Sequence, residues 1–406
     1  MSTLLRPATE WELKSMIASL AERQTSVEVV GAGSKRACGR PVGASVLLST
    51  AMLRGITLYE PTELVMSARS GTPLSQIEVE LAARGQMLPF EPIDLGPMLG
   101  QQSGVQTLGG VIGGNFSGSR RLAAGAARDH VLGIQAINGR AEQFKSGGRV
   151  MKNVTGYDLA RGITGSWGTL AVITEVTLKV LPLPDDMTTL VYTGLTDELA
   201  VELMCAAAGS PFEVSGTVHL TPVLASRLKT GDLSEDKKSI TALRIENFSK
   251  SVTYRKERLK ELLVAFGQPV ELDLDLSLKF WTELRRFSVL PYAATHVWRI
   301  STSPRNGPKL VSAIRRHVPV EVMYDWSGGL IWLEIPASAD AGAADVRRAV
   351  ASFGGHATLI RAEESVRRDV QVFQPLTPAV ARLTQGIKAA FDPLGVLNPG
   401  RMYANV

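Results

Sequence analysis

The chain has 406 residues, 45% of them apolar and 20% charged, which is typical of a globular protein large enough for two or three domains. No apolar run approaches the roughly 20 residues needed to span a bilayer. The start MSTLLRPATEWELK lacks the apolar centre of a secretory signal, and Cys38 and Cys205 provide no disulfide framework. We therefore expect a cytoplasmic protein. The net charge of +5 comes without a zinc-finger, RNA-recognition or helix-turn-helix signature, which argues against a nucleic-acid-binding protein.

The first third of the chain alternates short strands and helices. Thr9 and Glu12 form a capping-box pattern at the start of a helix, and a strand over 27–30 then runs into the loop Gly31-Ala32-Gly33-Ser34-Lys35. Such a loop after a strand is a candidate phosphate-binding loop, although Arg36 stands where a dinucleotide-binding fingerprint has its third glycine, and no Walker Gly-Lys-Ser/Thr follows. The sequence next predicts strands at 46–48, 56–59 and 64–68 and a helix from Pro73 to Gly85.

The stretch from Gly104 to Gly168 holds 15 of the 38 glycines, a density that packing alone does not favour because glycine weakens helices and strands. Within it, the run 107–115 can expose successive N–H groups that line an anion, typically a pyrophosphate. Glycine-rich turns between strands are the alternative, but interleaved Thr, Asn and Ser residues favour a ligand cradle. A β-branched strand over 170–180 closes the stretch, and Pro182 and Pro184 mark a domain boundary.

The middle of the chain, from about 186 to 375, has a different character. The sequence predicts strands at 189–192, 216–220, 242–245, 296–301, 321–324 and 330–335, with helices near 251–266, 307–316 and 343–353. This order predicts an antiparallel sheet with helices on one side, built as a pair of split βαβ units. A helix over 378–390 and a turn-rich ending over 391–403 then predict a tail that docks onto the rest of the molecule.

Three segments together resemble the FAD-binding domain of the vanillyl-alcohol oxidase and p-cresol methylhydroxylase (PCMH) superfamily. They are VGAGSK, the block TLGG…NFSG…RRLAAGAARDHVLG, and GGRVMKNVTGYDLARGITGSWGTLAVITEVTLKVLP. The ending FDPLGVLNPGRMY resembles the 2-hydroxy-acid branch, and the combination is most similar to the family of FAD-binding E subunits of bacterial glycolate oxidase. The resemblance is strong over about 1–184 and 378–403 and weaker between them.

The resemblance implies an α+β fold in three parts: a two-subdomain PCMH-type FAD-binding domain over 1–184, an α+β cap domain with an antiparallel sheet over 185–376, and a C-terminal segment over 377–406 that returns to the FAD domain. Its motifs assign the pyrophosphate loop to Gly31, Ala32, Gly33, Ser34 and Lys35. A second clamp, running along the ribityl-diphosphate, matches Thr107, Gly109, Gly110, Gly113, Asn115 and Ser117. Gly168, Thr169 and Ile173 match the segment at the adenine and ribose, and Asn398 matches a position near the flavin ring.

Departures from the family pattern limit the chemistry that the resemblance implies. Ser34 and Lys35 follow the loop glycines where covalent members carry a flavin-linking histidine or cysteine, so we expect non-covalent FAD. The chain lacks the His-Xaa-Gly-Asp-Gly-Asn segment of catalytic 2-hydroxy-acid members, and its five histidines show no metal-ligand spacing, so no metal is expected. Catalytic residues stay unassigned. Arg299, Trp298 and Trp326 are weak candidates beside the plainer interpretation of strand core with one buried ion pair.

We therefore expect an FAD-dependent oxidoreductase acting on CH–OH donors, as the FAD-binding subunit of a glycolate oxidase-type complex that oxidises glycolate, or a related 2-hydroxy acid, to glyoxylate. The resemblance implies two partners: a larger flavoprotein subunit with the metal and substrate site, and an iron–sulfur subunit that receives electrons. Through these partner subunits we expect the cytoplasmic chain to reach the inner membrane. The alternatives are a self-sufficient FAD-dependent oxidase or dehydrogenase of the same superfamily and a structural subunit without flavin.

Overall fold

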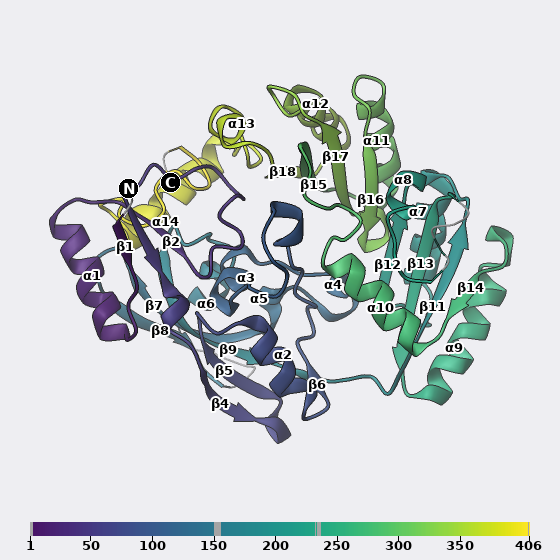
Figure 1. Cartoon of the computed structure of the whole chain (residues 1–406), viewed down its shortest axis with the longest axis horizontal. Helices are drawn as coiled ribbons and strands as arrows, with labels where there is room; N and C mark the ends of the chain where they lie inside the picture. The colour runs from purple at the N-terminus through teal and green to yellow at the C-terminus, as the bar shows by residue number, and fades with distance from the viewer. Residues whose placement is uncertain (1–2, 150–155, 232, 234–236, 405) are drawn as a thin grey trace.

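The computed structural model describes residues 3–149, 156–231, 233, 237–404 and 406. Two halves lie side by side: the first contains the sheets formed by residues 3–182 and the end of the chain, and the second contains one large sheet from the middle (Figure 1). No helix within the described ranges is both long enough and apolar enough to cross a bilayer.

A small parallel sheet and one helix form the outer lobe of the first half. Its strand order is β1-β3-β2, and its elements are β1 (Thr3–Leu5), α1 (Glu10–Glu22), β2 (Val27–Val30) and β3 (Val46–Ser49). The predicted helix start is confirmed, because the Thr9 hydroxyl accepts a hydrogen bond from the Glu12 N–H at 3.1 Å. Leu13 and Ile17 of α1 are fully buried against Leu48 and the tail residue Leu397.

A five-stranded antiparallel sheet forms the inner lobe. Its order is β4 (Ile56–Glu60), β5 (Val65–Arg69), β9 (Ala171–Lys179), β7 (Val131–Asn138) and β8 (Gln143–Gly147). The helices of this lobe are α2 (Leu74–Ala82), α3 (Leu108–Gly114), α4 (Arg121–Ala124), α5 (Ala127–His130) and α6 (Leu159–Ile163), and β6 (Gln86–Met87) pairs with β10 (Leu181–Pro182). Apolar side chains of α2, α3 and α6 pack with β5 and β9 in a common core.

The glycine-rich run differs from the expected amide-lined loop, because it forms the helix α3. Leu108, Val111 and Ile112 lie at helical spacing and are fully buried in the core of the inner lobe. Burial of these three side chains offsets the low helix propensity of the glycines between them. The helix ends at Asn115, which adopts φ +51°.

The second half is an eight-stranded antiparallel sheet made of two equivalent units. Its order is β14 (Val270–Leu272), β11 (Asp186–Thr193), β13 (Ile240–Asn247), β12 (Gly216–Leu220), β16 (Glu321–Asp325), β17 (Leu330–Pro336), β15 (Thr295–Ser301) and β18 (His356–Arg361). Each unit runs strand-helix-strand-strand-helix-strand, and the units meet where β12 pairs with β16. The predicted pair of split βαβ units is thus confirmed.

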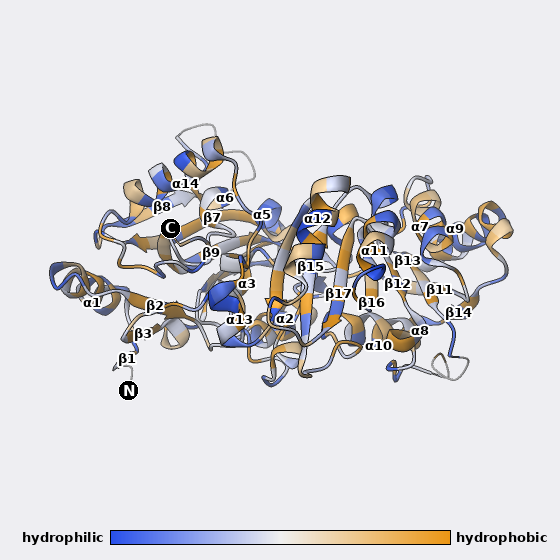
Figure 2. Cartoon of the chain, turned by 90° about the horizontal axis from the view of Figure 1, so that it is seen from above, coloured by the Kyte–Doolittle hydropathy of each residue, from blue (hydrophilic) through white to orange (hydrophobic). Residues whose placement is uncertain are grey.

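Helices cover both faces of this sheet, whereas the sequence predicted helices on one side. One face packs against α7 (Asp197–Ala208), α9 (Ser249–Leu262), α11 (Gly307–Arg315) and α12 (Ala343–Phe353). The opposite face packs against α8 (Pro222–Ala225), α10 (Leu274–Arg285) and residues of the first half such as Leu95 and Phe116 (Figure 2). We call the latter the inner face, because it is the one that meets the first half.

The end of the chain returns to the first half, as predicted. After α13 (Glu364–Asp369), α14 (Pro378–Phe391) leads to a turn whose Leu397 bridges to Val27 of β2. The ammonium of Lys388 contacts the Thr169 and Leu397 carbonyls and the Asp392 carboxylate at 2.7–2.8 Å, which fixes the tail in place.

Candidate cofactor site

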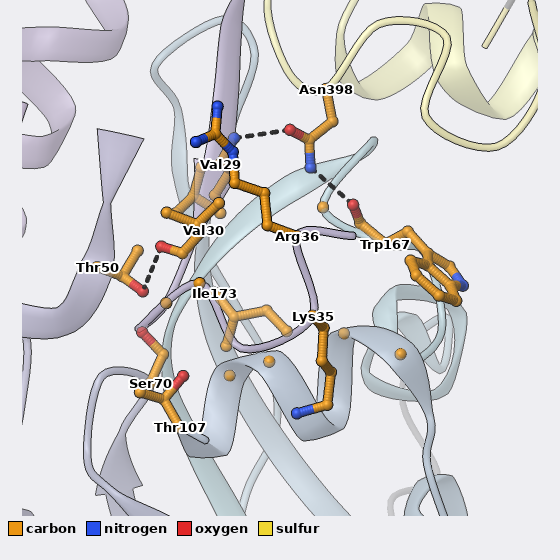
Figure 3. A pocket seen from close by; sticks show the side chains of 18 of the residues that line it. Val29, Val30, Lys35, Arg36, Thr50, Ser70, Thr107, Trp167, Ile173 and Asn398 are labelled. Carbon is orange, nitrogen blue, oxygen red and sulfur yellow. Dashed lines mark hydrogen bonds between the residues drawn. The ribbon is translucent and has the colours of Figure 1, made fainter. Parts of the chain in front are cut away.

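A cavity lies in the first half, where the loop after β2, α3, the start of β9 and the returning tail meet (Figure 3). It encloses about 790 Å³, including open solvent at its mouth. A second hollow on the other side of the 31–36 loop shares Gly31, Gly33 and Ser34 with it. Residues of the loop therefore line two hollows.

The loop approaches α3 closely because Gly31 has no side chain. A Cβ atom at Gly31 would lie 2.1 Å from the Thr107 hydroxyl oxygen, far inside van der Waals contact. The two basic residues that end the loop then point in different directions (Figure 3). Arg36 forms an ion pair with Glu28 at 2.7 Å, whereas the Lys35 ammonium donates to the Gln106 side chain at 2.8 Å and lines the cavity.

Lys35 is a cation held in a poorly solvated place. Burial lowers the pKa of its ammonium to about 8, although the charges of Asp94 and Cys38 oppose the shift. The ammonium also lies 5.9 Å from the centroid of the Phe116 ring. A bound anion would stabilise this charge. Lys35 is the one lysine among the described residues that line the cavity.

Glycines of α3 present bare backbone to the cavity. A Cβ at Gly113 would meet no atom within 4 Å, and one at Gly110 would meet only the Thr107 hydroxyl, at 3.5 Å. Gly109, by contrast, packs on Ser70, where a Cβ would come within 2.8 Å of the serine Cβ. The space in front of Gly110 and Gly113 is thus left for something other than the chain itself.

The tail closes the opposite wall through Asn398. Its side-chain oxygen accepts from the Val29 N–H and its amide nitrogen donates to the Trp167 carbonyl, each at 2.7 Å (Figure 3). Gly168 adopts φ +70°, and a Cβ there would lie 2.8 Å from the Asn398 amide nitrogen. Asn398 therefore joins β2 to the start of β9 across the cavity.

The cavity suits an extended, partly anionic cofactor. The hydroxyl of Ser70 lines it and is buried without a hydrogen-bond partner in the described part of the chain, so a polar group of a ligand would satisfy it. Bare helix backbone, one lysine, an unpaired hydroxyl and apolar walls such as Val172 and Ile173 match the polyol, phosphates and rings of a dinucleotide.

Most of the residues assigned from the sequence meet in this cavity. Its lining includes Gly31, Ala32, Gly33, Ser34, Lys35, Thr107, Gly109, Gly110, Gly113, Gly168, Ile173 and Asn398. Three others do not line it and hold neighbouring backbone instead. Asn115 accepts from the Arg128 N–H, Ser117 accepts from the Ala127 N–H, and the Thr169 hydroxyl donates to the Ser166 carbonyl.

Two of the assigned residues lie close together in the cavity wall. Gly168, expected at the adenine and ribose, follows Trp167, whose carbonyl accepts a hydrogen bond from Asn398, the residue expected near the flavin ring. The part of a bound cofactor that each of them meets stays a prediction.

Several lining residues have no distinct sequence signal. Phe116 and Trp167 stand inside the quoted glycine-rich motifs and pack edge to face at 5.6 Å, and Arg401 follows the tail glycine. Ser70 lies in an ordinary strand-to-helix turn. The glycine motifs predict where backbone approaches a ligand. That these side chains line the cavity can be recognised only from the folded structure.

The three weak catalytic candidates lie on different faces of the large sheet. Trp298 is fully buried on the face under α12, where its indole N–H donates to the Ala341 carbonyl at 2.8 Å, so it cannot act beside the other two. Trp326 belongs to the inner face, and the Arg299 guanidinium carbon lies 5.1 Å from its ring centroid. Within the described ranges, no group of three or more His, Cys, Asp or Glu side chains could hold a metal ion.

Comparisons with known proteins agree with this geometry. A family model described as an FAD binding domain matches residues 1–147. The chain is 35% identical over 385 residues to glycolate oxidase subunit GlcE of Escherichia coli, which covers 94% of each chain. It is 26% identical over 188 residues to glycolate oxidase subunit GlcD of Bacillus subtilis, covering 46% of this chain and 38% of GlcD. The structure of p-cresol methylhydroxylase with substrate bound superposes with a TM-score of 0.75 at 12% identity, covering 99% of this chain and 88% of the other.

Proposed function

Because the chain belongs to the family of glycolate oxidase subunit GlcE, we propose that it binds FAD without a covalent link in the cavity between the β2 loop, α3 and the tail. It is an FAD-dependent oxidoreductase subunit of a multi-subunit glycolate oxidase-type complex. The cavity carries the proposal: a lysine, an unpaired serine hydroxyl and two unobstructed helix glycines converge on a space that the chain itself leaves open.

Each part of the cavity has a role in this proposal. Lys35 neutralises the diphosphate, and Gly110 and Gly113 let the cofactor approach the α3 backbone. Ser70 hydrogen-bonds to a hydroxyl or phosphate oxygen, and Asn398 keeps the two walls in register. When bound, FAD supplies a two-electron acceptor for the oxidation of a CH–OH group.

The same proposal divides the chain into an FAD-binding domain over 1–184, a cap domain over 185–376 and a returning segment over 377–406. The sheet composition supports this division, since strands β1 to β10 pair among themselves and β11 to β18 form a separate sheet. We further propose that the complex contains a larger GlcD-like flavoprotein subunit and an iron–sulfur subunit, that its substrate is glycolate or a related 2-hydroxy acid, and that the chain is cytoplasmic and reaches the inner membrane through its partners.

An absorbance spectrum of the chain purified alone, recorded before and after anaerobic addition of glycolate, tests the proposal. We expect a yellow protein whose flavin does not bleach, because the described residues contain no group of acidic, histidine or cysteine side chains that could hold a metal ion beside the substrate. Bleaching would show a self-sufficient oxidase or dehydrogenase instead. A colourless protein that also fails to take up added FAD would leave only a structural role and would overturn the flavin assignment.

A further inference from the structure

Two guanidinium groups lie against one indole ring where the halves of the molecule meet. The Arg121 guanidinium carbon is 4.4 Å from the centroid of Trp326, and that of Arg299 is 5.1 Å from it. Arg121 begins α4 in the first half, whereas Arg299 comes from β15 on the inner face of the large sheet. Two positive charges from distant parts of the sequence are therefore brought together on an apolar surface.

Neither guanidinium forms an ion pair within the described residues, since no Asp or Glu oxygen lies within 4.0 Å of Arg121 or Arg299. The charges of Asp129 and Asp325 act on them only from further away. Other arginines at the centre of the molecule do have partners: Arg244 pairs with Glu91 at 2.7 Å and Arg361 with Glu334 at 2.9 Å. Burial and, to a smaller extent, the charge of Arg121 lower the pKa of Arg299 to about 10, although the charge of Asp325 opposes the shift. An uncompensated pair of this kind favours a bound anion.

Asp325, the nearby acid, does not serve as the missing partner. Its two carboxylate oxygens already accept hydrogen bonds from the Ser119 hydroxyl at 2.8 Å and the Trp326 N–H at 2.7 Å. Burial raises the pKa of this carboxyl to about 7, although both hydrogen bonds oppose the shift, and it forms no ion pair with Arg121 or Arg299.

Trp326 is held in a conformation that the local sequence does not favour. Its φ is +51°, in the left-handed region that is unfavourable for a bulky residue. The indole N–H donates to the Gly118 carbonyl at 3.0 Å, and the backbone N–H is fixed by Asp325. Such residues gather at ligand sites, because the surrounding structure must impose them.

The arginine pair is adjacent to the cofactor cavity along the chain. Phe116 lines the cavity, Gly118 holds the Trp326 indole, and Arg121 follows three residues later. Five residues of fully extended chain span at most about 17 Å, so Arg121 lies within that distance of Phe116. A ligand on the two arginines would thus sit near the end of the cavity that Phe116 and Trp167 close.

We propose that Arg121 and Arg299, stacked on Trp326, form a binding site for a small carboxylate anion. Guanidinium groups pair with carboxylates through two parallel hydrogen bonds. The inference rests on the proposed function, because it identifies the anion as the carboxylate of the 2-hydroxy acid or of the 2-oxo acid formed from it. It also assigns the site to this subunit rather than to a partner.

The test is titration of the FAD-loaded chain with oxalate and with glycolate, followed by calorimetry and by tryptophan fluorescence. Arg121→Gln and Arg299→Gln should each weaken binding by about tenfold or more, and the double variant should abolish it. Arg382→Gln, at an exposed position of α14, is the matched control and should bind as the wild type does. FAD content should be the same in all of these proteins.

Melting temperature separates a ligand site from a structural role. Neither arginine forms an ion pair with a described acidic residue, and their positive charges repel each other. Replacing them should therefore leave the melting temperature unchanged or raise it. Wild-type protein that binds neither anion at up to about 10 mM, or a double variant that binds both normally, would overturn the inference. Lack of FAD in the purified chain would contradict the proposed function instead, and the same titration of that protein would still decide whether the arginines bind the anion.

Discussion

Lys35 reaches the cavity because the preceding loop can turn sharply, with Gly33 at φ +84°, and because Arg36 is held away by Glu28. The GAGSK motif was sufficient to predict its place. The sequence could not show that this lysine is buried, since the neighbours that contact or influence it, Asp94, Gln106 and Phe116, lie far from it along the chain.

The lowered pKa of Lys35 predicts how FAD affinity depends on pH. The ammonium is charged below about pH 8 and a bound diphosphate would raise its pKa, so affinity should be constant below that pH and fall above it. Between about pH 7 and pH 9 the dissociation constant should rise by about tenfold, measured by quenching of flavin fluorescence.

Two substitutions control this measurement. Lys35→Arg keeps its charge over the whole range, so its affinity should not change with pH. Lys35→Met should bind FAD weakly at every pH. A wild-type affinity that stays constant from pH 7 to pH 9 would show that Lys35 does not contact the anionic part of the cofactor.

Ser70, Arg121 and Arg401 show what a single sequence conceals at the scale of residues. Each is an ordinary residue in its local context and becomes notable only through neighbours far along the chain. Trp298 and Arg299 are adjacent in sequence, yet the alternation of a β-strand places them on opposite faces. Which face meets the first half depends on tertiary packing.

At the scale of elements, α3 shows why the sequence predicted exposed backbone N–H groups in the glycine-rich run and did not predict a helix there. Its four glycines suggested unpaired backbone, but Leu108, Val111 and Ile112 repeat at helical spacing and determine the conformation. The glycines then occupy the side that faces the cavity, which explains both their number and their absence from the core.

Valine substitutions in α3 provide a direct test of cofactor binding. Gly110→Val and Gly113→Val should fold normally, because an added Cβ meets no close contact and neither residue has a positive φ. Both side chains would project into the cavity, so FAD content after purification should fall by at least about tenfold.

Gly386→Val is the matched control, since Gly386 lies in α14, is exposed, and also has open space around its Cα. It should retain FAD like the wild type. Normal flavin content in both α3 variants would place the cofactor elsewhere.

The large sheet was well predicted, because its strands are rich in β-branched and other apolar residues, and six of the eight were expected from the sequence. β14 and β18 were not, since β14 has only three residues and β18 begins with the exposed His356. α10 was also missed, although it packs Phe280 and Trp281 onto the inner face. Short edge strands carry too little periodicity to be recognised alone.

At the scale of the whole molecule, buried ion pairs join the two halves. The Arg244 guanidinium of β13 donates to both carboxylate oxygens of Glu91, at 2.7 and 3.1 Å, and lies 4.4 Å from the Trp281 ring. Burial alone would raise the pKa of Glu91, but the charges of Arg244 and Arg120 overcome this and lower it to about 2. The carboxylate therefore stays charged and paired at all ordinary pH values.

Removal of one partner should strongly destabilise the chain. Arg244→Met leaves Glu91 buried and poorly compensated, so the free energy of unfolding should fall by about 3–5 kcal/mol in denaturant titrations. The double variant Arg244→Met/Glu91→Gln should recover part of the loss, because it no longer buries an unpaired charge.

Arg258→Met provides the comparison, since Arg258 pairs with Glu261 on the exposed side of α9. Its loss should cost less than about 1 kcal/mol. If Arg244→Met lowered the free energy of unfolding by as little as Arg258→Met, the pair with Glu91 would not be what holds the halves together.

The contact between Asn398 and Val29 has a consequence for synthesis on the ribosome. The two residues are 369 positions apart, so at 5–20 residues per second roughly 20–70 s separate the emergence of the β2 loop from that of its partner. Until then the Val29 N–H and the Trp167 carbonyl lack the side chain that joins them. A nascent chain therefore carries the phosphate loop and the glycine helix long before the residue that joins the two walls of the cavity has been made.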